Sequence, residues 1–365
     1  MMIKAALLVI LVTLVVSAAL TALARKLAPR IGLVAVPRSD RYHEHIVPMG
    51  GGLAIFTTLA LAMLGALLLS SGKLAMLEPW LQRAGLEISD LARHRPELWV
   101  LLGCSGTLFA LGLWDDMRGL GPLKKLIVQL GVAFTAAYFA DMRVELFIPY
   151  RFLTALLSAC WITLIMNAFN FLDNMDGASA GIATIVTAIL LTAAVASGQI
   201  LVGGLALVLI GTLLGFLIFN FPPAKIFMGD AGSLLMGFLV AILSLRTTYY
   251  HETKSGDMYA IFIPLIALSV PLYDFVSVTT LRLLQGKSPL VGDTQHFSHR
   301  LKRRGLSDTQ TILTLYLATL CTGLGATFLY QVNHIGAWLI ILQTILVLVI
   351  IAILEANNSQ DAKET

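Results

Sequence analysis

Long apolar runs separated by short polar segments dominate the chain from residue 5 to residue 354. A helix that crosses a bilayer needs roughly 17–25 predominantly apolar residues, and most of these runs reach that length. We therefore predict an all-α polytopic membrane protein with about eleven transmembrane helices. The predicted spans cover residues 5–24, 51–70, 98–114, 125–140, 152–169, 180–197, 200–219, 231–246, 259–281, 310–330 and 335–354.

The first run could instead be a cleavable signal peptide, because Ala22-Leu23-Ala24 resembles a cleavage site. Arg25 and Lys26 directly after the run suit a retained first span better. We expect one integral membrane domain over residues 1–355, followed by a short polar tail over residues 356–365 that lies in the cytoplasm.

Basic residues predict the orientation of the spans. If the first span runs from outside to inside, the inside segments hold 16 of the 25 Lys and Arg residues. Inside loops of membrane proteins carry this excess of positive charge. The pattern places the N-terminus outside and the C-terminus in the cytoplasm.

Composition agrees with a membrane protein, with 58% hydrophobic and 13% charged residues, where soluble domains have about 25% charged residues. The isoelectric point of about 9.0 comes largely from the inside loops, which face anionic lipid. Nucleic-acid binding is not implied. Cys104, Cys160 and Cys321 stand singly within spans, so we interpret them as small apolar residues.

Two neighbouring aspartates, Asp115 and Asp116, close the third predicted span. Adjacent side chains on a helix diverge by about 100°, so they can share one contact only where the helix ends. One could face a cavity while a base such as Lys125 holds the other. The alternative is a helix end with solvated charges.

The richest polar stretch ends the fifth span, with side chains recurring at every third residue: Asn167, Asn170, Asp173 and Asp176. On a helix this spacing keeps neighbours on adjoining faces and would aim them at one cavity. Oxygen donors at this density suit Mg²⁺, which bridges to substrate phosphates. The alternative is an Asn/Asp-rich turn that ends at Gly177.

A proline-interrupted loop runs from Asn220 into the eighth span. Asp230 is a natural N-cap for that span, which would be a purely structural role. However, Gly229 and Gly232 let a ligand approach the backbone closely, and the free N–H groups of a helix start attract phosphate. A metal-bound pyrophosphate would fit between this loop and the Asn-rich stretch.

Two histidines, His296 and His299, precede Arg300 in the longest inside loop. No Cys or further His accompanies them, which disfavours zinc. Imidazoles beside an arginine suit phosphate oxygens better. The alternative is a basic loop at the membrane surface. A capping box formed by Ser307 and Gln310 begins the next span.

All four clusters lie on one predicted side of the membrane. Charges at mid-depth of a bilayer cost roughly 2.5–3.5 kcal/mol, so polar groups gathered at helix ends favour a working site. Carboxylates, oxygen ligands and basic groups are what a Mg²⁺-dependent phosphoryl transfer requires.

In their order along the chain, these motifs resemble the polyprenyl-phosphate N-acetylhexosamine-1-phosphate transferases, which are glycosyltransferase family 4. The resemblance runs from Arg41 to Ser307. The matching positions are His43, Pro48, Gly50, Gly51, Asp115, Asp116, Lys125, Gln129, Asn167, Asn170, Asp173, Asp176, Gly177, Asn220, Phe227, Gly229, Asp230, Gly232, Pro271, Asp274 and Arg282.

The resemblance implies that the oxygen of a lipid phosphate attacks the β-phosphorus of a UDP-amino-sugar and releases UMP. It implies Mg²⁺, with Mn²⁺ as a substitute, held by Asp230 and Asn170. Asp115 would be the base or, in a two-step scheme, the nucleophile, and Asp116 would support the site.

The remaining implied roles are contacts to the substrates. Phe227 would stack on uracil, while His296, His299 and Arg300 would grip the pyrophosphate or the sugar. The other implied substrate-binding residues are His43, Lys125, Asn167, Asp173, Asp176 and Asn220.

The spaced histidines indicate the branch of the family. The spacing of His296 and His299 resembles the pattern in enzymes that use UDP-N-acetylglucosamine, such as those for O-antigen or teichoic acid. The peptidoglycan enzyme has a run of consecutive histidines in this loop instead. Asn174 and Ser298 stand where many relatives have Gly and His. We expect N-acetylglucosamine-1-phosphate transfer to undecaprenyl phosphate in the bacterial inner membrane, with phospho-N-acetylmuramoyl-pentapeptide transfer as the alternative. The sequence leaves open whether the protein forms a homodimer.

Two other classes are rivals. Asn170, Asp173 and Asp176 resemble the diphosphate motif of intramembrane aromatic prenyltransferases, but a second Asp-rich repeat is missing and the histidine loop has no role there. A transporter would carry internal repeats and polar groups near mid-membrane. Both are less favoured than the transferase.

Overall fold

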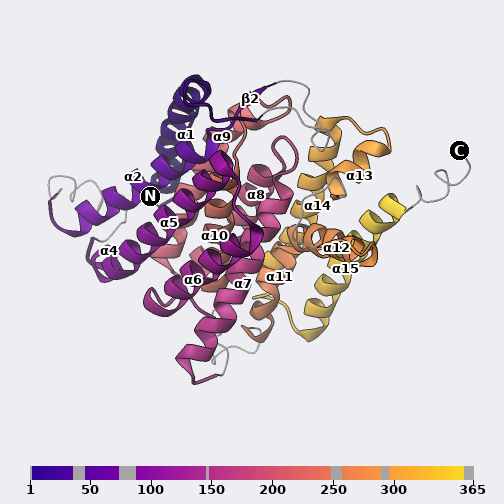
Figure 1. Cartoon of the computed structure of the whole chain (residues 1–365). Coiled ribbons are helices and arrows are strands. Elements are labelled where there is room, and N and C mark those ends of the chain that lie inside the picture. The colour runs from indigo at the N-terminus through magenta and orange to yellow at the C-terminus, as the bar shows by residue number, and fades with distance from the viewer. Residues whose placement is uncertain are drawn as a thin grey trace, which may run out of the picture.

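The structure of the chain is a computed structural model, and it describes residues 2–35, 46–73, 88–144, 148–247, 257–288 and 296–356. Helices make up nearly all of its regular structure (Figure 1). The long helices are α1 (Met2–Leu27), α2 (Gly51–Ser70), α5 (Arg95–Arg118), α6 (Pro122–Phe139), α7 (Arg151–Leu172), α8 (Ala178–Ala196), α9 (Ile200–Asn220), α10 (Asp230–Arg246), α12 (Ser269–Leu284), α14 (Asp308–Phe328) and α15 (His334–Ala356).

Shorter elements connect these helices. They are the 3₁₀ segments η1 (Ala28–Ile31) and η3 (Asp257–Phe262), and the short helices α4 (Ile88–Arg93), α11 (Ile263–Ala267) and α13 (Phe297–Arg303). Two strands, β1 (Val34–Ala35) and β2 (Val47–Pro48), pair antiparallel with Val34 opposite Pro48. The prediction of an all-α polytopic membrane protein is confirmed.

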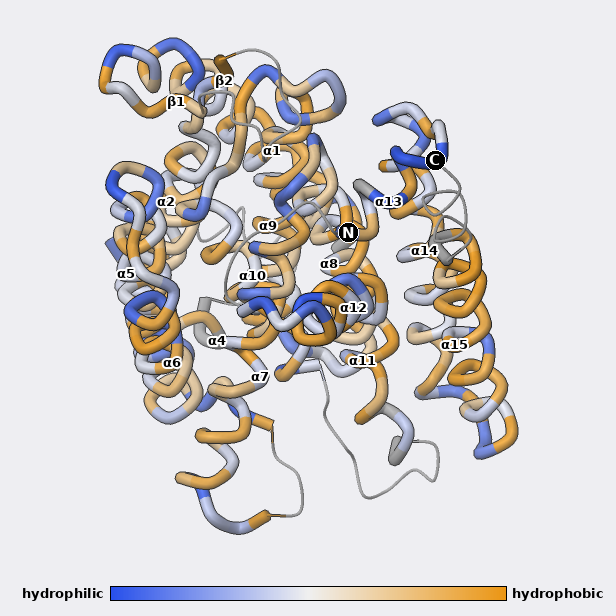
Figure 2. Tube along the Cα trace, turned by 45° about the vertical axis from the view of Figure 1, so that its right-hand side comes forward, coloured by the Kyte–Doolittle hydropathy of each residue, from blue (hydrophilic) through white to orange (hydrophobic). Residues whose placement is uncertain are grey.

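Eight helices in the described ranges are long and apolar enough to cross a membrane, namely α1, α2, α5, α7, α8, α9, α14 and α15. Their outer surfaces carry large exposed apolar side chains, such as Leu7 on α1 and Leu346 on α15. Figure 2 shows the hydrophobic colour along the helices and hydrophilic segments concentrated at their ends. This distribution is what a bilayer requires of the helices that face it.

Helix α10 forms the centre of the bundle. Every residue from Ala231 to Leu245 is buried, and α10 packs against α2, α5, α7 and α8. A helix that is apolar on all sides is stable only when neighbours cover its whole circumference. Its first residue, Asp230, is therefore held in place by the surrounding helices rather than by lipid.

The segment predicted as one span over residues 259–281 is not one helix. It consists of η3, α11 and α12, with a break at Leu268. Pro271 has no backbone N–H, and its ring clashes with the carbonyl four residues earlier, at Ala267. The apolar run predicted burial at this place but could not reveal the break.

Candidate active site

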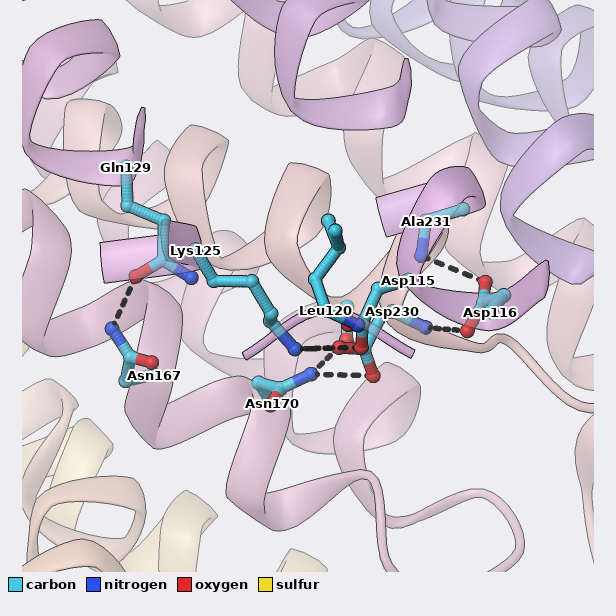
Figure 3. A network of polar contacts seen from close by, with 10 residues as sticks. Asp115, Asp116, Leu120, Lys125, Gln129, Asn167, Asn170, Asp230 and Ala231 are labelled. Atoms are coloured by element: carbon cyan, nitrogen blue, oxygen red, sulfur yellow. Dashed lines mark hydrogen bonds and ion pairs between the residues drawn. The ribbon is translucent and has the colours of Figure 1, made fainter. Parts of the chain in front are cut away.

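The ends of four helices bring the predicted acidic and amide residues together (Figure 3). Asp115 and Asp116 lie in the last turn of α5, and Asn170 lies in the last turn of α7. Lys125 lies in the first turn of α6, and Asp230 is the first residue of α10. Residues 115 positions apart in the sequence thus share one polar cluster.

Small residues allow these helices to approach. A Cβ atom on Gly112 would lie 2.4 Å from the backbone nitrogen of Ala231, so α5 and α10 touch through their backbones. A Cβ atom on Gly52 of α2 would lie 2.5 Å from the nitrogen of Gly232. Side chains at these positions would separate the carboxylates that the packing brings together.

Gly229 sets the direction in which the chain enters α10. Its φ is +69°, which L side chains rarely adopt, and a Cβ atom there would lie 2.5 Å from Oδ2 of Asp116. Only glycine fits both requirements.

Lys125 joins two carboxylates. Its Nζ donates to Oδ2 of Asp115 at 2.9 Å and also to Oδ2 of Asp230. The three side chains are between 16% and 26% exposed, and removing one partner of such a partly buried group would leave an uncompensated charge. The prediction that a base such as Lys125 holds one of the neighbouring aspartates is confirmed for Asp115.

Asp116 binds the start of α10. Its carboxylate accepts hydrogen bonds from the backbone N–H groups of Asp230 at 2.8 Å and Ala231 at 3.1 Å. The N-cap position belongs to Gly229, and no side chain of the preceding loop caps the helix there. The interpretation of Asp230 as the N-cap is therefore wrong, because a carboxylate from α5 takes that role and leaves the Asp230 side chain to the cluster.

The Asn-rich stretch divides between two surroundings. Nδ2 of Asn170 donates to Oδ1 of Asp230 at 3.0 Å and to Oγ of Ser233 at 2.9 Å. Asn167 donates to Oε1 of Gln129 at 2.7 Å, one turn further from the carboxylates. Both amides face the space between α6, α7 and α10.

The three-residue spacing does not continue past the end of α7. Asp173 is the C-cap residue of that helix, and Asp176 accepts a hydrogen bond from the backbone of Ala224 at 2.8 Å. The expectation that all four residues point into one cavity is wrong for Asp176, because the helix ends before it and the chain turns at Gly177, whose φ is +72°.

Asn220 connects two loops. Its Oδ1 accepts from the N–H of Gly177 at 3.0 Å, and its Nδ2 donates to the carbonyl of Ile226 at 2.9 Å. The side chain is 3% exposed. These contacts favour a role in positioning the loops over direct contact with a substrate.

Phe227 lies half-buried in the loop before α10. Its N–H donates to the carbonyl of Pro48, and its carbonyl accepts from the N–H of Gly51, at 2.8 and 2.9 Å. The first predicted inside loop thus rests on the Phe227 segment. His43, predicted to bind substrate in that loop, lies outside the described residues.

The histidine segment is placed by α12. Nδ1 of His296 lies 3.0 Å from Oδ2 of Asp274, and the N–H of Phe297 donates to Oδ1 of the same carboxylate at 2.7 Å. Arg300 donates to Oγ of Ser277 at 2.8 Å. His299 belongs to α13, and its side chain lies outside the described part of the structure.

The end of α7 joins the histidine segment to the carboxylate cluster. The ring of Phe171 packs edge-on against His296 at 5.7 Å and lies 4.9 Å from the guanidinium carbon of Arg282. Asn174 accepts from the hydroxyl of Ser298 at 2.5 Å. The two groups of residues therefore flank one short stretch, from Asn167 to Asn174.

Sequence reasoning assigned no supporting role to two residues of the site, Ser233 and Asp274. Ser233 lies one turn after Asp230, a spacing at which helical side chains are neighbours, so that signal was present. Asp274 was known only as a match to the family pattern. Nothing in the sequence indicated its contact with His296, because that contact depends on how α12 and α13 pack.

The donor set fits a hard divalent cation. Asp115 and Asp230 contact the ammonium group of Lys125, and Asp116 lies beside them at the start of α10, so the cluster carries a formal charge of −2 when all four side chains are ionised. Carboxylate and amide oxygens are the protein ligands of Mg²⁺, which commonly binds one or two carboxylates and completes its shell with water and phosphate. Among the described residues, no three His, Cys, Asp or Glu side chains form a closed metal-binding group.

Comparisons with known proteins identify the family of the chain. Residues 98–248 match the family glycosyl transferase family 4. The chain is 32% identical over 315 residues to a probable undecaprenyl-phosphate N-acetylglucosaminyl 1-phosphate transferase of Bacillus subtilis. The match covers 84% of this chain and 80% of the relative.

Other relatives give the same result. A decaprenyl-phosphate N-acetylglucosaminephosphotransferase of Mycolicibacterium smegmatis is 31% identical, covering 80% of this chain and 74% of the relative. An undecaprenyl-phosphate alpha-N-acetylglucosaminyl 1-phosphate transferase of Salmonella typhi is 28% identical, covering 87% and 82%. The family predicted from the motifs is confirmed, and this chain belongs to glycosyl transferase family 4.

Proposed function

We propose that this protein transfers N-acetylglucosamine 1-phosphate from UDP-N-acetylglucosamine to undecaprenyl phosphate and releases UMP. The names of the similar proteins describe N-acetylglucosamine phosphate transfer to a polyprenyl phosphate. The observation that carries the proposal is the group formed by Asp115, Lys125, Asn170 and Asp230 at the joined ends of four helices.

In the proposed reaction, an oxygen of the lipid phosphate attacks the β-phosphorus of the nucleotide sugar. The bond from that phosphorus to the bridging oxygen breaks, and UMP leaves with the electron pair. One phosphoanhydride bond forms as another breaks, so the step is nearly isoenergetic and reversible.

Each residue of the cluster has a role in this proposal. Asp115 keeps the lipid phosphate deprotonated, and Lys125 offsets negative charge as the two anionic substrates meet. Asp116 holds the start of α10 and thereby fixes Asp230. His296, positioned by Asp274, contacts the sugar or the pyrophosphate.

Asp230 and Asn170 would hold Mg²⁺ through their side-chain oxygens. When bound, the ion would neutralise negative charge on the pyrophosphate of the nucleotide sugar. Lys125 contacts the same carboxylate of Asp230, so we expect its ammonium group to shift toward the substrate phosphates when the ion binds.

We also propose that the chain crosses the bacterial inner membrane eleven times, with the N-terminus outside and the site at the cytoplasmic face. The excess of basic residues supports this orientation. Lys125 lies in the first turn of α6 and Asn170 lies in the last turn of α7, so α6 leads away from the site and α7 returns to it. The same reasoning makes α10 a span, although it has only 17 residues, and α11 and α12 together form the eleventh span in this proposal. A single membrane domain over residues 1–355 with a cytoplasmic tail stays a prediction, and the tail lies outside the described residues beyond Ala356.

A direct assay tests the function. Purified protein in detergent would receive undecaprenyl phosphate with UDP-N-acetylglucosamine, UDP-N-acetylmuramoyl-pentapeptide or UDP-glucose, and both UMP and the sugar lipid would be measured. We expect UMP and product in equal amounts with the first donor only. EDTA should stop turnover, and Mg²⁺ should restore it. Product formation from the muramoyl donor alone would replace our choice of sugar.

Two substitutions test the site in the same assay. Asp115→Asn and Asp230→Asn should each lower turnover at least about 100-fold, because each removes a charge that acts on the reacting groups. Asp141→Asn is the matched control, since Asp141 is a half-exposed aspartate outside the cluster. Turnover like the wild type in either site variant would remove that residue from the mechanism.

A further inference from the structure

A hydrogen bond from α14 reaches the turn that joins α7 to α8. The hydroxyl of Tyr316 donates to the carbonyl of Gly177 at 2.7 Å, although 139 positions separate the two residues. Tyr316 lies in α14, which packs along α8 and stands outside the residues that match the family. Gly177 is buried and is the N-cap residue of α8. A helix remote in sequence therefore holds the turn that follows the Asn-rich stretch.

The glycines of α8 make room for this tyrosine. A Cβ atom on Gly181, one turn into α8, would overlap the hydroxyl and the ring of Tyr316. A Cβ atom on Gly177 would lie 3.3 Å from the same hydroxyl oxygen. The side chain of Tyr316 thus fills a space that a side chain at residue 181 would take from it.

Both backbone groups of Gly177 are bonded. Its N–H donates to Oδ1 of Asn220, the last residue of α9, at 3.0 Å. Its carbonyl accepts from the N–H of Gly181 at 3.0 Å as well as from Tyr316. A carbonyl oxygen has two lone pairs, and these two donors use both. The turn is therefore held from α9 on one side and from α14 on the other.

The hydrogen bonds continue into the loop before α10. Nδ2 of Asn220 donates to the carbonyl of Ile226 at 2.9 Å, and Ile226 directly precedes Phe227, which we expect to stack on uracil. A continuous series of bonds thus runs from Tyr316 through Gly177 and Asn220 to the Phe227 segment. Bonds in such a network strengthen one another, so the loss of one member loosens the rest.

We propose that Tyr316 is a positioning residue for the nucleotide sugar, acting through Gly177 and Asn220 on the segment that carries Phe227. This inference rests on the proposed function and deepens it. The carboxylates of Asp115 and Asp230 are placed by the contact of α5 with α10, so Tyr316 affects binding of the donor rather than the chemical step.

Tyr316→Phe tests this inference, because it removes the hydroxyl and keeps the ring. In the full-length protein in detergent, KM for UDP-N-acetylglucosamine and Kd for UMP should each rise about fivefold, as expected for the loss of one hydrogen bond. The kcat should stay close to that of the wild type. Steady-state UMP release and calorimetry with UMP would give the three constants.

Tyr330→Phe is the matched control. The hydroxyl of Tyr330 donates to the carbonyl of Thr247 at 2.6 Å, and Thr247 follows α10 at the end opposite Asp230. Both variants lose a bond from a tyrosine to a backbone carbonyl, so thermal unfolding should change similarly, but only Tyr316→Phe should raise KM. Wild-type constants in Tyr316→Phe, or an equal rise of KM in both variants, would overturn the proposal.

Gly181→Ala keeps the inference testable if Tyr316→Phe does not fold. Its Cβ would meet the end of a side chain that can swing aside, so the hydroxyl is displaced without being removed. KM should rise as in Tyr316→Phe, and the double variant should raise it no further, because both changes break the same bond. Gly204→Ala on α9, where a Cβ would meet nothing within 4 Å, should keep the wild-type KM. A wild-type KM in Gly181→Ala would contradict the inference.

The inference and the proposed function fail in different ways. Turnover of another UDP-sugar by the wild type would change the proposed donor, and the same KM values would then be compared with that sugar. Without turnover of any donor, the affinities for UMP alone would decide. A wild type that bound no UMP would overturn the inference as well.

Discussion

The carboxylate cluster and the histidine segment are built in different ways. The carboxylates come from helices whose backbones touch at glycine, as Gly112 does against Ala231. The histidine segment is a short helix, α13, which is held by hydrogen bonds to Asp274, Ser277 and Asn174 and by the buried side chains of Phe297 and Leu301. The first is therefore fixed by backbone contact between long helices, whereas the second is fixed by the side-chain contacts of one short helix.

This difference indicates a division of labour in the proposed reaction. Groups that act on the reacting phosphates need precise placement, since a displacement of 1 Å can cost about 100-fold in rate. Groups that recognise the sugar or the base can tolerate a looser attachment. Changes in helix packing should therefore lower kcat, and changes around α13 should mainly raise KM.

The largest effect is expected from Gly112→Ala. The new Cβ would lie 2.4 Å from the nitrogen of Ala231, and a backbone atom cannot move aside as a flexible side chain can. We expect α5 to shift from α10, with turnover about 100-fold lower and a loss of about 1–3 kcal/mol in stability. UMP release and thermal unfolding would measure these two changes.

Gly103→Ala is the matched control for that variant. It lies on the same helix, and a Cβ there would meet nothing within 4 Å. It should keep full turnover. If the two alanine variants had equal activity, close contact of α5 and α10 would not be what sets the carboxylates.

A smaller effect is expected from Asp274→Asn. The carboxylate accepts bonds from both His296 and the N–H of Phe297, and an amide has one acceptor oxygen instead of two. His296 should lose its fixed orientation, which should raise KM for UDP-N-acetylglucosamine about tenfold while kcat changes less than threefold. Steady-state kinetics would separate the two constants.

Asp141→Asn provides the comparison for that variant, because Asp141 is a half-exposed aspartate that pairs with Arg143 away from α13. It should leave both constants unchanged. A large fall in kcat for Asp274→Asn with an unchanged KM would contradict the separation of the two regions.

The smallest effect is expected from Phe227→Ala. Stacking of an aromatic ring contributes about 0.5–1.5 kcal/mol beyond burial, so the affinity for UMP should fall about fivefold. Phe227→Tyr should retain the affinity, because its ring can still stack. Calorimetry with UMP would measure both, and an unchanged affinity in Phe227→Ala would exclude the stacking role.

Sequence patterns predicted the helices well because bilayer-spanning segments must be long and apolar. The apolar runs over residues 51–70 and 200–219 coincide closely with α2 and α9. The break between α11 and α12 was missed, since the run across it is continuously apolar. Pro271 was the one local signal, and proline in a spanning helix often produces only a kink.

The sequence predicted which residues form the carboxylate cluster better than it predicted the hydrogen bonds between them. Polar residues at the ends of apolar runs identified Asp115, Asn170 and Asp230. Their individual roles depend on contacts between distant residues, such as the bond from the backbone of Asp230 to Asp116. Asp176 was misplaced for a related reason, because a three-residue spacing has meaning only while the helix continues.

The complete burial of α10 has a consequence for how the bilayer affects this protein. Helices α1 and α15 expose much of their surface, and only 17% and 22% of their apolar windows are buried. A thinner or thicker bilayer is accommodated by tilting of the helices that face it. Because α10 has no such surface, we expect Asp230 to keep its depth and its alignment with Asp115 as acyl-chain length varies.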